Sequence, residues 1–201
     1  MPTPRSPVPP PVAPPPPAEI RSPDWRRELI NNVMDCVWSP LRHVLYVHPW
    51  GEPGDLQDVD GPYQWQTDIL NLIGNHLQNP TTRHTPLKIA VASGKGIGKS
   101  ALISMVSKWG MDTCDDCRIT VTANTEPQLR TKTWPEITKW FRSAINSYWF
   151  TLGATSITAK DAAHERTWRT DTMPWSENNS QAFAGLHNKG KRIILIFDEA
   201  S

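Results

Sequence analysis

The segment 93–100, SGKGIGKS, restricts the fold of this chain more than any other stretch. The apolar run 87–92 before it and the helical periodicity after it predict a strand, a glycine-rich loop and a helix in succession. The glycines allow a tight loop, and Lys99 and Ser100 stand where the helix should begin. This spacing is typical of a phosphate-binding loop, in which Ser93 occupies the place of the usual first glycine.

A second motif lies near the end of the chain, where the apolar run 193–197 is followed by Asp198 and Glu199. The run predicts a buried strand. At its carboxyl end one carboxylate can hold magnesium while another polarises an attacking water. We therefore assign Asp198 to Mg2+ and Glu199 to general-base catalysis. A solvated strand end is the alternative for this pair, but the preceding phosphate loop favours ATP hydrolysis.

Strands and helices alternate along the chain, which predicts an α/β fold with a parallel sheet covered by helices. Residues 151–185 are polar and give no clear assignment. The remaining predictions are a helix over 24–45 broken at Pro40, a loop over 48–62, a helix over 63–77, a helix over 98–111, a strand over 118–123, and a helical stretch over 126–149 interrupted at Pro135.

The length of 201 residues predicts one domain with a tail. Residues 1–18 contain ten prolines, so they are expected to form a disordered tail. Docking into an aromatic groove of a partner is the alternative function for this tail. The formal net charge is only +1, so any contact with DNA or RNA requires a local cluster of cations.

The three cysteines do not suggest a disulfide framework, because their number is odd and no apolar leader precedes them. The longest strongly apolar run, 193–197, is far too short to span a membrane. A soluble protein in a reducing compartment, with no membrane partner, is therefore expected. Cys114 and Cys117 form a C-x-x-C, which we interpret as an exposed loop rather than a zinc site because no second ligand pair lies within reach.

Four blocks of the sequence resemble the ATPase part of the large terminase subunit of tailed bacteriophages and prophages. They are residues 49–70, 91–102, 121–140 and 182–201, and the similarity covers 48–201. The resemblance implies a P-loop NTPase fold of the additional-strand, helicase-like class. It also implies a motor in the host cytoplasm that uses ATP and Mg2+ to pump double-stranded DNA into a procapsid. Its implied partners are a portal protein, a small terminase subunit and further copies in a ring.

The same resemblance implies roles for individual residues. Gln66 corresponds to a glutamine that recognises adenine, with Gln64 and Trp65 beside it; an ordinary surface glutamine is the alternative. Lys95 occupies the place of a basic residue that senses or stabilises the γ-phosphate. Ser93 agrees with the family, which commonly departs from glycine there. The expected catalytic residues are Glu199, Lys99 and Lys95, and the expected Mg2+ ligands are Ser100 and Asp198. The expected ATP-binding residues are Gly94, Lys95, Gly96, Ile97, Gly98, Lys99, Ser100, Ala101, Gln66 and Trp65.

Residues 121–140 correspond to a block that faces DNA or the nucleotide-sensing machinery in related motors. Arg130 and Lys132 in this block are candidates for contact with DNA phosphates or a neighbouring subunit. A solvated helix face explains two such charges equally well. The six histidines show no metal-binding or triad spacing and are expected to be structural or superficial.

Residues 19–201 correspond to the amino-terminal portion of the terminase ATPase domain, without its later strands or a nuclease domain. In this class, the strand between the phosphate-loop strand and the Asp-Glu strand comes later in the sequence. Without that strand, the two motif strands lack their shared neighbour, and buried backbone groups are left without partners. We therefore expect residues 1–201 alone to hydrolyse ATP poorly, if at all. Two alternatives stay open: another P-loop DNA-translocating ATPase of the helicase type, and an inactive prophage remnant that binds nucleotide without turnover.

Overall fold

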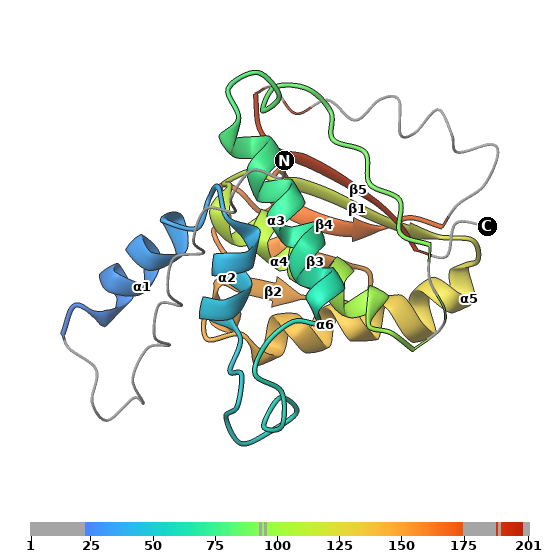
Figure 1. Ribbon diagram of the computed structural model, residues 1–201, viewed down its shortest axis with the longest axis horizontal. Coiled ribbons are helices and arrows are strands. Elements are labelled where there is room, and N and C mark those ends of the chain that lie inside the picture. The colour runs from blue at the N-terminus through green and yellow to red at the C-terminus, as the bar shows by residue number, and fades with distance from the viewer. Residues whose placement is uncertain (1–22, 93, 95, 175–187, 189, 199–201) are drawn as a thin grey trace, which may run out of the picture.

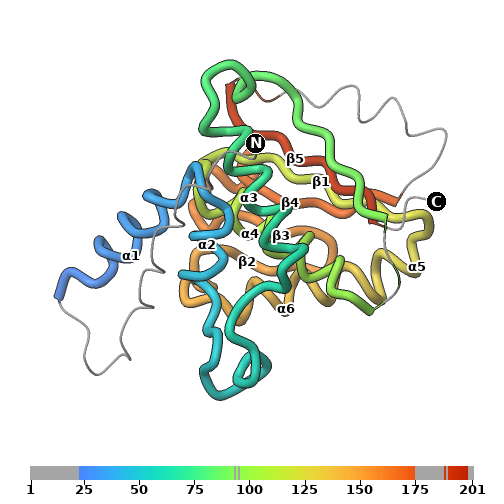
Figure 2. Tube along the Cα trace, viewed as in Figure 1, coloured from blue at the N-terminus to red at the C-terminus, as the bar shows by residue number. Residues whose placement is uncertain are grey.

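The computed structural model describes residues 23–92, 94, 96–174, 188 and 190–198 (Figure 1). The proline-rich tail predicted for residues 1–18 lies outside this part of the chain. The described residues form an α/β fold with one sheet and flanking helices, as the alternating sequence pattern predicts. The trace in Figure 2 shows α2 and α3 in front of the strands, with α1 to one side beside α2.

Five strands within the described residues form one sheet in the order β2-β3-β4-β1-β5. Strand β1 pairs in parallel with both β4 and β5, whereas β3 pairs antiparallel with β2 and β4. The prediction of a purely parallel sheet is therefore wrong. The antiparallel part arises from the polar segment that gave no assignment, because short strands with mixed side chains lack a strong periodic signal. The strands are β1 (Arg118–Ala123), β2 (Phe150–Leu152), β3 (Ser156–Ala159), β4 (Arg169–Thr172) and β5 (Ile193–Asp198).

The helices begin and end close to the predicted positions. Pro40 divides the first predicted helix, since it forms the first residue of α2 while the Ser39 hydroxyl accepts a hydrogen bond from the backbone N–H of Arg42. The stretch around Pro135 is also divided, by a π-helical turn. The helices are α1 (Trp25–Met34), α2 (Pro40–Val47), α3 (Gln64–Gln78), α4 (Lys99–Thr113), α5 (Glu126–Gln128), the π-helical turn η2 (Leu129–Thr133), α6 (Trp134–Ser143) and the 3-10 turn η3 (Ser147–Trp149).

Helix α4 lies at the centre of the packing. It contacts β1, β4 and β5 on one side and α2 and α6 on others. The approach to the sheet is close at Gly110, where an added Cβ would lie 2.6 Å from Ile194 Cδ1. A separate apolar cluster joins α4 to α2, α3 and α6, and α3 crosses in front of the strands in Figure 1. This cluster consists of Leu41, Val44, Leu70, Leu102, Met105 and Trp140.

Two strand predictions fail at one side of the sheet. Residues 87–92 form no strand, and Leu87, Ile89 and Val91 are exposed. Strand β5 does form, but it is not buried as predicted: it is the last strand of the sheet, and its exposed residues include Phe197 at 48%. Within the described residues β5 pairs with β1 alone. An apolar run predicts that a strand forms, but which segments pack against that strand depends on the tertiary fold.

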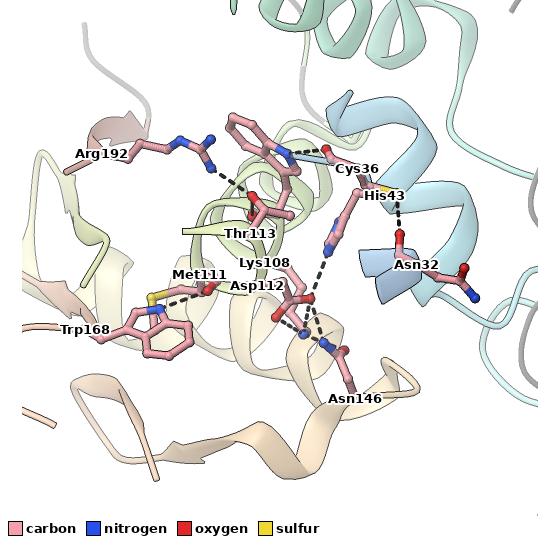
Figure 3. Close-up of polar contacts among 11 residues, drawn as sticks. Asn32, Cys36, His43, Lys108, Met111, Asp112, Thr113, Asn146, Trp168 and Arg192 are labelled. Atoms are coloured by element: carbon pink, nitrogen blue, oxygen red, sulfur yellow. Dashed lines mark hydrogen bonds and ion pairs between the residues drawn. The ribbon is translucent and has the colours of Figure 1, made fainter. Parts of the chain in front are cut away.

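A buried polar cluster joins α4 to α2 and to the segment after α6 (Figure 3). We call it the Lys108 cluster; its members are Lys108, Asp112, His43 and Asn146. Lys108 Nζ lies 2.6 Å from both carboxylate oxygens of Asp112 and 2.7 Å from Asn146 Oδ1. The Asp112 Oδ2 atom also lies 2.8 Å from His43 Nε2 and accepts a hydrogen bond from Asn146. All four residues are buried, and the charges of Lys108 and Asp112 compensate each other inside the protein.

Burial and pairing act in opposite directions on these groups. Burial alone would raise the pKa of Asp112, but Lys108 and His43 outweigh it and hold the pKa below its ordinary value. Burial lowers the pKa of Lys108 and of His43, although Asp112 opposes both shifts. Nearby His48 is fully buried against Trp140, and its two ring nitrogens have no hydrogen-bond partner among the described residues. Burial lowers its pKa well below the ordinary value.

The sequence predicts no membrane span. In the part of the chain that the structure describes, no helix combines the length and the apolar character needed to cross a membrane.

Candidate nucleotide site

The phosphate loop ends at Gly98, the residue before α4. Gly96 and Gly98 have φ values of +79° and +87°, in the left-handed region that glycine occupies without strain. A Cβ at Gly98 would also lie 2.8 Å from Gln66 Nε2, so both the backbone and the space require glycine there. Because the loop runs directly into α4, the unpaired N–H groups of the first helical turn lie at its end.

Lys99 is the first residue of α4, and its side chain folds over the loop. Its Nζ atom donates a hydrogen bond of 2.7 Å to the carbonyl oxygen of Gly94. Cβ atoms added at Gly94 and Gly96 would meet nothing within 4 Å, so the described part of the loop is open on that side. Ser93 and Lys95 lie outside the described residues. The ATP-binding candidates Ile97, Ser100 and Ala101 are all half-buried around the start of α4.

Gln66 supports the phosphate loop from α3. Its Nε2 donates a hydrogen bond of 2.8 Å to the carbonyl oxygen of Gly98, and its Oε1 accepts one of 2.9 Å from the backbone N–H of Tyr63. The residue is buried, which differs from the surface glutamine considered as the alternative. Gln64 lies on the exposed side of α3 and bonds Asp68, while Trp65 packs against the apolar cluster of α2, α3, α4 and α6.

Tyr63 is a site residue that the sequence interpretation missed. Two of its ring carbons lie 3.5 and 3.6 Å from the position that a Cβ of Gly98 would occupy, and the side chain is 63% exposed. An exposed aromatic ring beside a phosphate loop offers an apolar surface on which a flat ring can stack. Its position at the first residue of the predicted helix was a visible signal, because Gln66 three residues later was already assigned to the nucleotide.

Asp198 ends β5 and is buried. Its Oδ2 atom accepts a hydrogen bond of 2.5 Å from the hydroxyl of Thr133, which is also buried. Strand β5 lies beside β1, and Asp198 stands opposite Ala123, the last residue of β1. Asp198 therefore lies at the carboxyl end of two parallel strands, where ligand sites of open α/β sheets are built. Glu199, the proposed general base, lies outside the described residues.

The π-helical turn η2 holds Thr133 in this position. Short π-helical turns are rare and are often found at functional sites. The turn is continuous with α6, whose second residue is Pro135, so proline marks the change in helix type. Thr133 had no local sequence signal, because its importance depends on a contact 65 positions away in the chain.

Arg130 and Lys132 belong to the same turn, and both are exposed. Arg130 contributes to a cavity of about 230 Å³ that also touches Glu126, Trp134 and Thr172. Exposure fits both interpretations of these two cations, a DNA-facing surface and a solvated helix face. Their role stays a prediction.

Comparisons of this chain with protein-family models, with curated proteins and with solved structures give no match. The described residues contain no group of three or more His, Cys, Asp or Glu side chains arranged to hold a metal ion by themselves. A divalent cation at Asp198 would thus need oxygen ligands from elsewhere, as is usual for Mg2+ bound together with substrate phosphates.

Proposed function

We propose that this chain binds Mg-ATP at the phosphate loop and is the ATP-hydrolysing part of a motor that packages double-stranded DNA, similar to the terminase large subunit. The nucleotide-binding part of the proposal depends chiefly on one observation: two left-handed glycines lead into the first turn of α4, with Lys99 across the loop. The packaging role, with a portal, a small subunit and a ring of copies, depends on the sequence resemblance alone.

The described residues fit a triphosphate bound with its cation. The N–H groups of the first turn of α4 and the ammonium of Lys99 supply positive charge at an open loop. When phosphate is present, Lys99 is expected to exchange the Gly94 carbonyl for phosphate oxygens, since an ammonium–phosphate bond is the stronger of the two. Tyr63 and Gln66 lie beside Gly98 and would face the nucleoside side of the ligand. Each end of the Gln66 amide retains one hydrogen-bonding position beyond its present bonds.

Asp198 and Ser100 are the residues that would hold Mg2+ in this proposal. The cation would neutralise charge on the phosphates during transfer to water. Among the described residues, Thr133 contacts Asp198 at Oδ2, so Oδ1 would remain available for a metal-bound water or the ion. Thr133 fixes the carboxylate orientation, and Glu199 would accept the proton of the attacking water. Lys95 would contact the γ-phosphate.

The test is nucleotide binding by the whole 201-residue chain, measured by equilibrium dialysis with labelled ATP and Mg2+. Lys99→Ala should weaken binding at least about 10-fold, because it removes a charge-assisted hydrogen bond to phosphate worth roughly 1.5–3 kcal/mol. The control is Lys160→Ala, at an exposed lysine in the turn after β3, which should leave the affinity unchanged. Equal affinity of the Lys99→Ala variant and the unmodified protein would contradict the proposed site.

Binding without turnover is a second candidate function, favoured by a specific observation. Residues 87–92 form no strand, so the segment leading into the phosphate loop is not held by the sheet that carries Asp198. Positioning errors of about 1 Å are enough to reduce catalysis strongly. We therefore expect residues 1–201 alone to bind ATP but to release phosphate slowly. Rapid phosphate release in a coupled assay, unaffected by Lys99→Ala, would instead show that the activity belongs to a different site.

A further inference from the structure

The turn between α4 and β1 brings two thiols together. Cys114 follows the last residue of α4, and the backbone N–H of Cys117 donates a hydrogen bond of 3.2 Å to the Cys114 carbonyl oxygen. Asp116 within the turn has a left-handed φ of +57°, and its carboxylate is held by His164 and Thr167 at 2.7 and 2.6 Å. Both cysteines are free thiols, and the Cys114 thiol donates a hydrogen bond of 3.6 Å to the Asp115 carbonyl oxygen. A four-residue turn keeps their Cα atoms within about 7 Å, the reach of a disulfide.

The two thiols differ in access to solvent. Cys117 is fully buried and belongs to the main core cluster beside Ile119 and Met111. Cys114 is half-buried, so a small solute can reach it. Redox-sensitive cysteines are accessible to solvent and often lie next to a second cysteine that resolves the oxidised form, and Cys114 and Cys117 share this arrangement.

Arg192 places positive charge beside this turn. Its guanidinium lies 3.9 Å from the centre of the Trp109 ring, and its Nη1 donates a hydrogen bond of 2.8 Å to the Thr113 hydroxyl (Figure 3). Because Trp109 and Thr113 hold the guanidinium in place, its charge next to Cys114 is a fixed feature of the fold.

These contacts favour the thiolate form of Cys114. The hydrogen bond from Cys117 lowers the pKa of Cys114 to about 6, with further help from Arg192, while burial and Asp115 oppose the shift. The same hydrogen bond and burial raise the pKa of Cys117. Of the other charged groups at the turn, Asp115 is paired with Lys191 at 2.6 Å and Asp116 with His164. The carboxyl-terminal end of α4 also opposes a negative charge, so the hydrogen bonds and Arg192 must outweigh the helix dipole.

We propose that Cys114 and Cys117 form a peroxide-reactive thiol pair that is oxidised reversibly to a disulfide. The Cys114 thiolate attacks one oxygen of a hydroperoxide such as hydrogen peroxide, forming an S–O bond as the O–O bond breaks and hydroxide leaves. Cys117 then attacks the Cys114 sulfur, forming the S–S bond. The S–O bond breaks, and the departing oxygen takes up the Cys117 proton and leaves as water. In sum, two thiols and one hydrogen peroxide give one disulfide and two waters.

The first test is alkylation by iodoacetamide between pH 5 and 9, with each cysteine followed by peptide mass spectrometry. Cys114 should show a rate midpoint near pH 6. Cys36 is the internal control, because burial raises its pKa to about 11 and it lies fully inside the core. At pH 7 the thiolate fraction of Cys114 exceeds that of Cys36 by about 10⁴. The lower nucleophilicity of the more acidic thiol offsets about 10² of this difference, so Cys114 should react on the order of 100-fold faster than Cys36. A Cys114 midpoint near pH 8.5, or equal rates for the two cysteines, would overturn the proposal.

The second test uses hydrogen peroxide followed by dimedone, a trap for sulfenic acid. The unmodified protein should lose two hydrogens within 114–117, regain them with dithiothreitol and give no dimedone adduct. Cys117→Ser should give an adduct at Cys114, because the resolving thiol is missing. Cys114→Ser should give neither product and serves as the matched control, since both variants exchange sulfur for oxygen in the same turn. A dimedone adduct at Cys114 in the unmodified protein, persisting without a disulfide, would show that Cys117 does not resolve it.

Discussion

The two ends of α4 differ in how they are held. At the carboxyl-terminal end, Lys108 is fully buried and bonded to Asp112 and Asn146. At the amino-terminal end, Lys99 lies at an exposed loop and bonds a backbone carbonyl. The charge of Lys108 is compensated inside the protein, whereas Lys99 lies beside a loop that is exposed to solvent. Helix α4 therefore places one lysine in the core and the other at the predicted phosphate loop.

The largest expected effect tests this division with the same substitution at both lysines. Lys108→Met should lower the free energy of unfolding by about 3–5 kcal/mol, because it leaves the Asp112 carboxylate buried without its charged partner. Lys99→Met should cost about 1 kcal/mol or less, since the hydrogen bond of Lys99 to the Gly94 carbonyl lies outside the core. Urea unfolding followed by tryptophan fluorescence measures both values.

A second substitution separates charge compensation from packing. Adding Asp112→Leu to Lys108→Met should recover part of the lost stability, because the unpaired carboxylate is then gone. Similar losses for Lys99→Met and Lys108→Met would show that the two ends of α4 do not differ as described.

An intermediate effect is expected at Thr133, whose buried hydroxyl donates a hydrogen bond to Asp198 at the candidate nucleotide site. Thr133→Val keeps the shape of the side chain but leaves Asp198 Oδ2 without its donor, so a loss of about 1–3 kcal/mol in the free energy of unfolding is expected. The control is Thr131→Val in the same turn, whose exposed hydroxyl bonds the Pro127 carbonyl. If both variants lose equal stability, the Thr133–Asp198 bond has no special importance.

The smallest effect concerns His48 and depends on pH. Because burial lowers the pKa of His48 in the folded protein, the unfolded chain, with a pKa near its ordinary value, binds the proton first as pH falls. The free energy of unfolding should therefore decrease below about pH 6.5, by at most about 1.4 kcal/mol per pH unit for this site.

His48→Phe keeps an aromatic ring against Trp140 and removes the titrating group, so it should reduce this slope. His43 remains and retains its own contribution, because burial lowers its pKa also. Urea unfolding at pH 7, 6 and 5 measures the slope. An unchanged slope in His48→Phe would show that His48 is not kept neutral by burial.

Local sequence patterns predicted the helices well. Pro40 with Ser39 before it, and the periodic apolar residues of α3 and α4, are signals contained within one element. Strand β1 was also predicted from its local pattern, and five of its six residues are buried. The sheet was predicted less well. The antiparallel strands β2 and β3 carry short mixed sequences, and their pairing depends on residues that lie elsewhere in the chain.

The same distinction applies to the candidate site. Lys99 and Gly98 were selected because the predicted phosphate loop is a continuous motif, and the structure confirms only that a helix begins there, at Lys99 directly after Gly98. Gln66 was identified from the resemblance, but its bond to the Gly98 carbonyl could not be foreseen from spacing. Thr133 and the Lys108 cluster were missed, because their importance depends on contacts between distant segments.

The open side of the sheet determines how the backbone of β5 is solvated. A strand that pairs on one side uses the peptide groups of alternate residues, and those between them point away from the partner. Within the described residues, β5 has β1 as its ladder partner, so the peptide groups between those that bond β1 point toward the other side of the strand. Hydrogen exchange along β5 should therefore alternate between slow and fast sites, whereas β1, with a neighbour on each side, should be protected throughout.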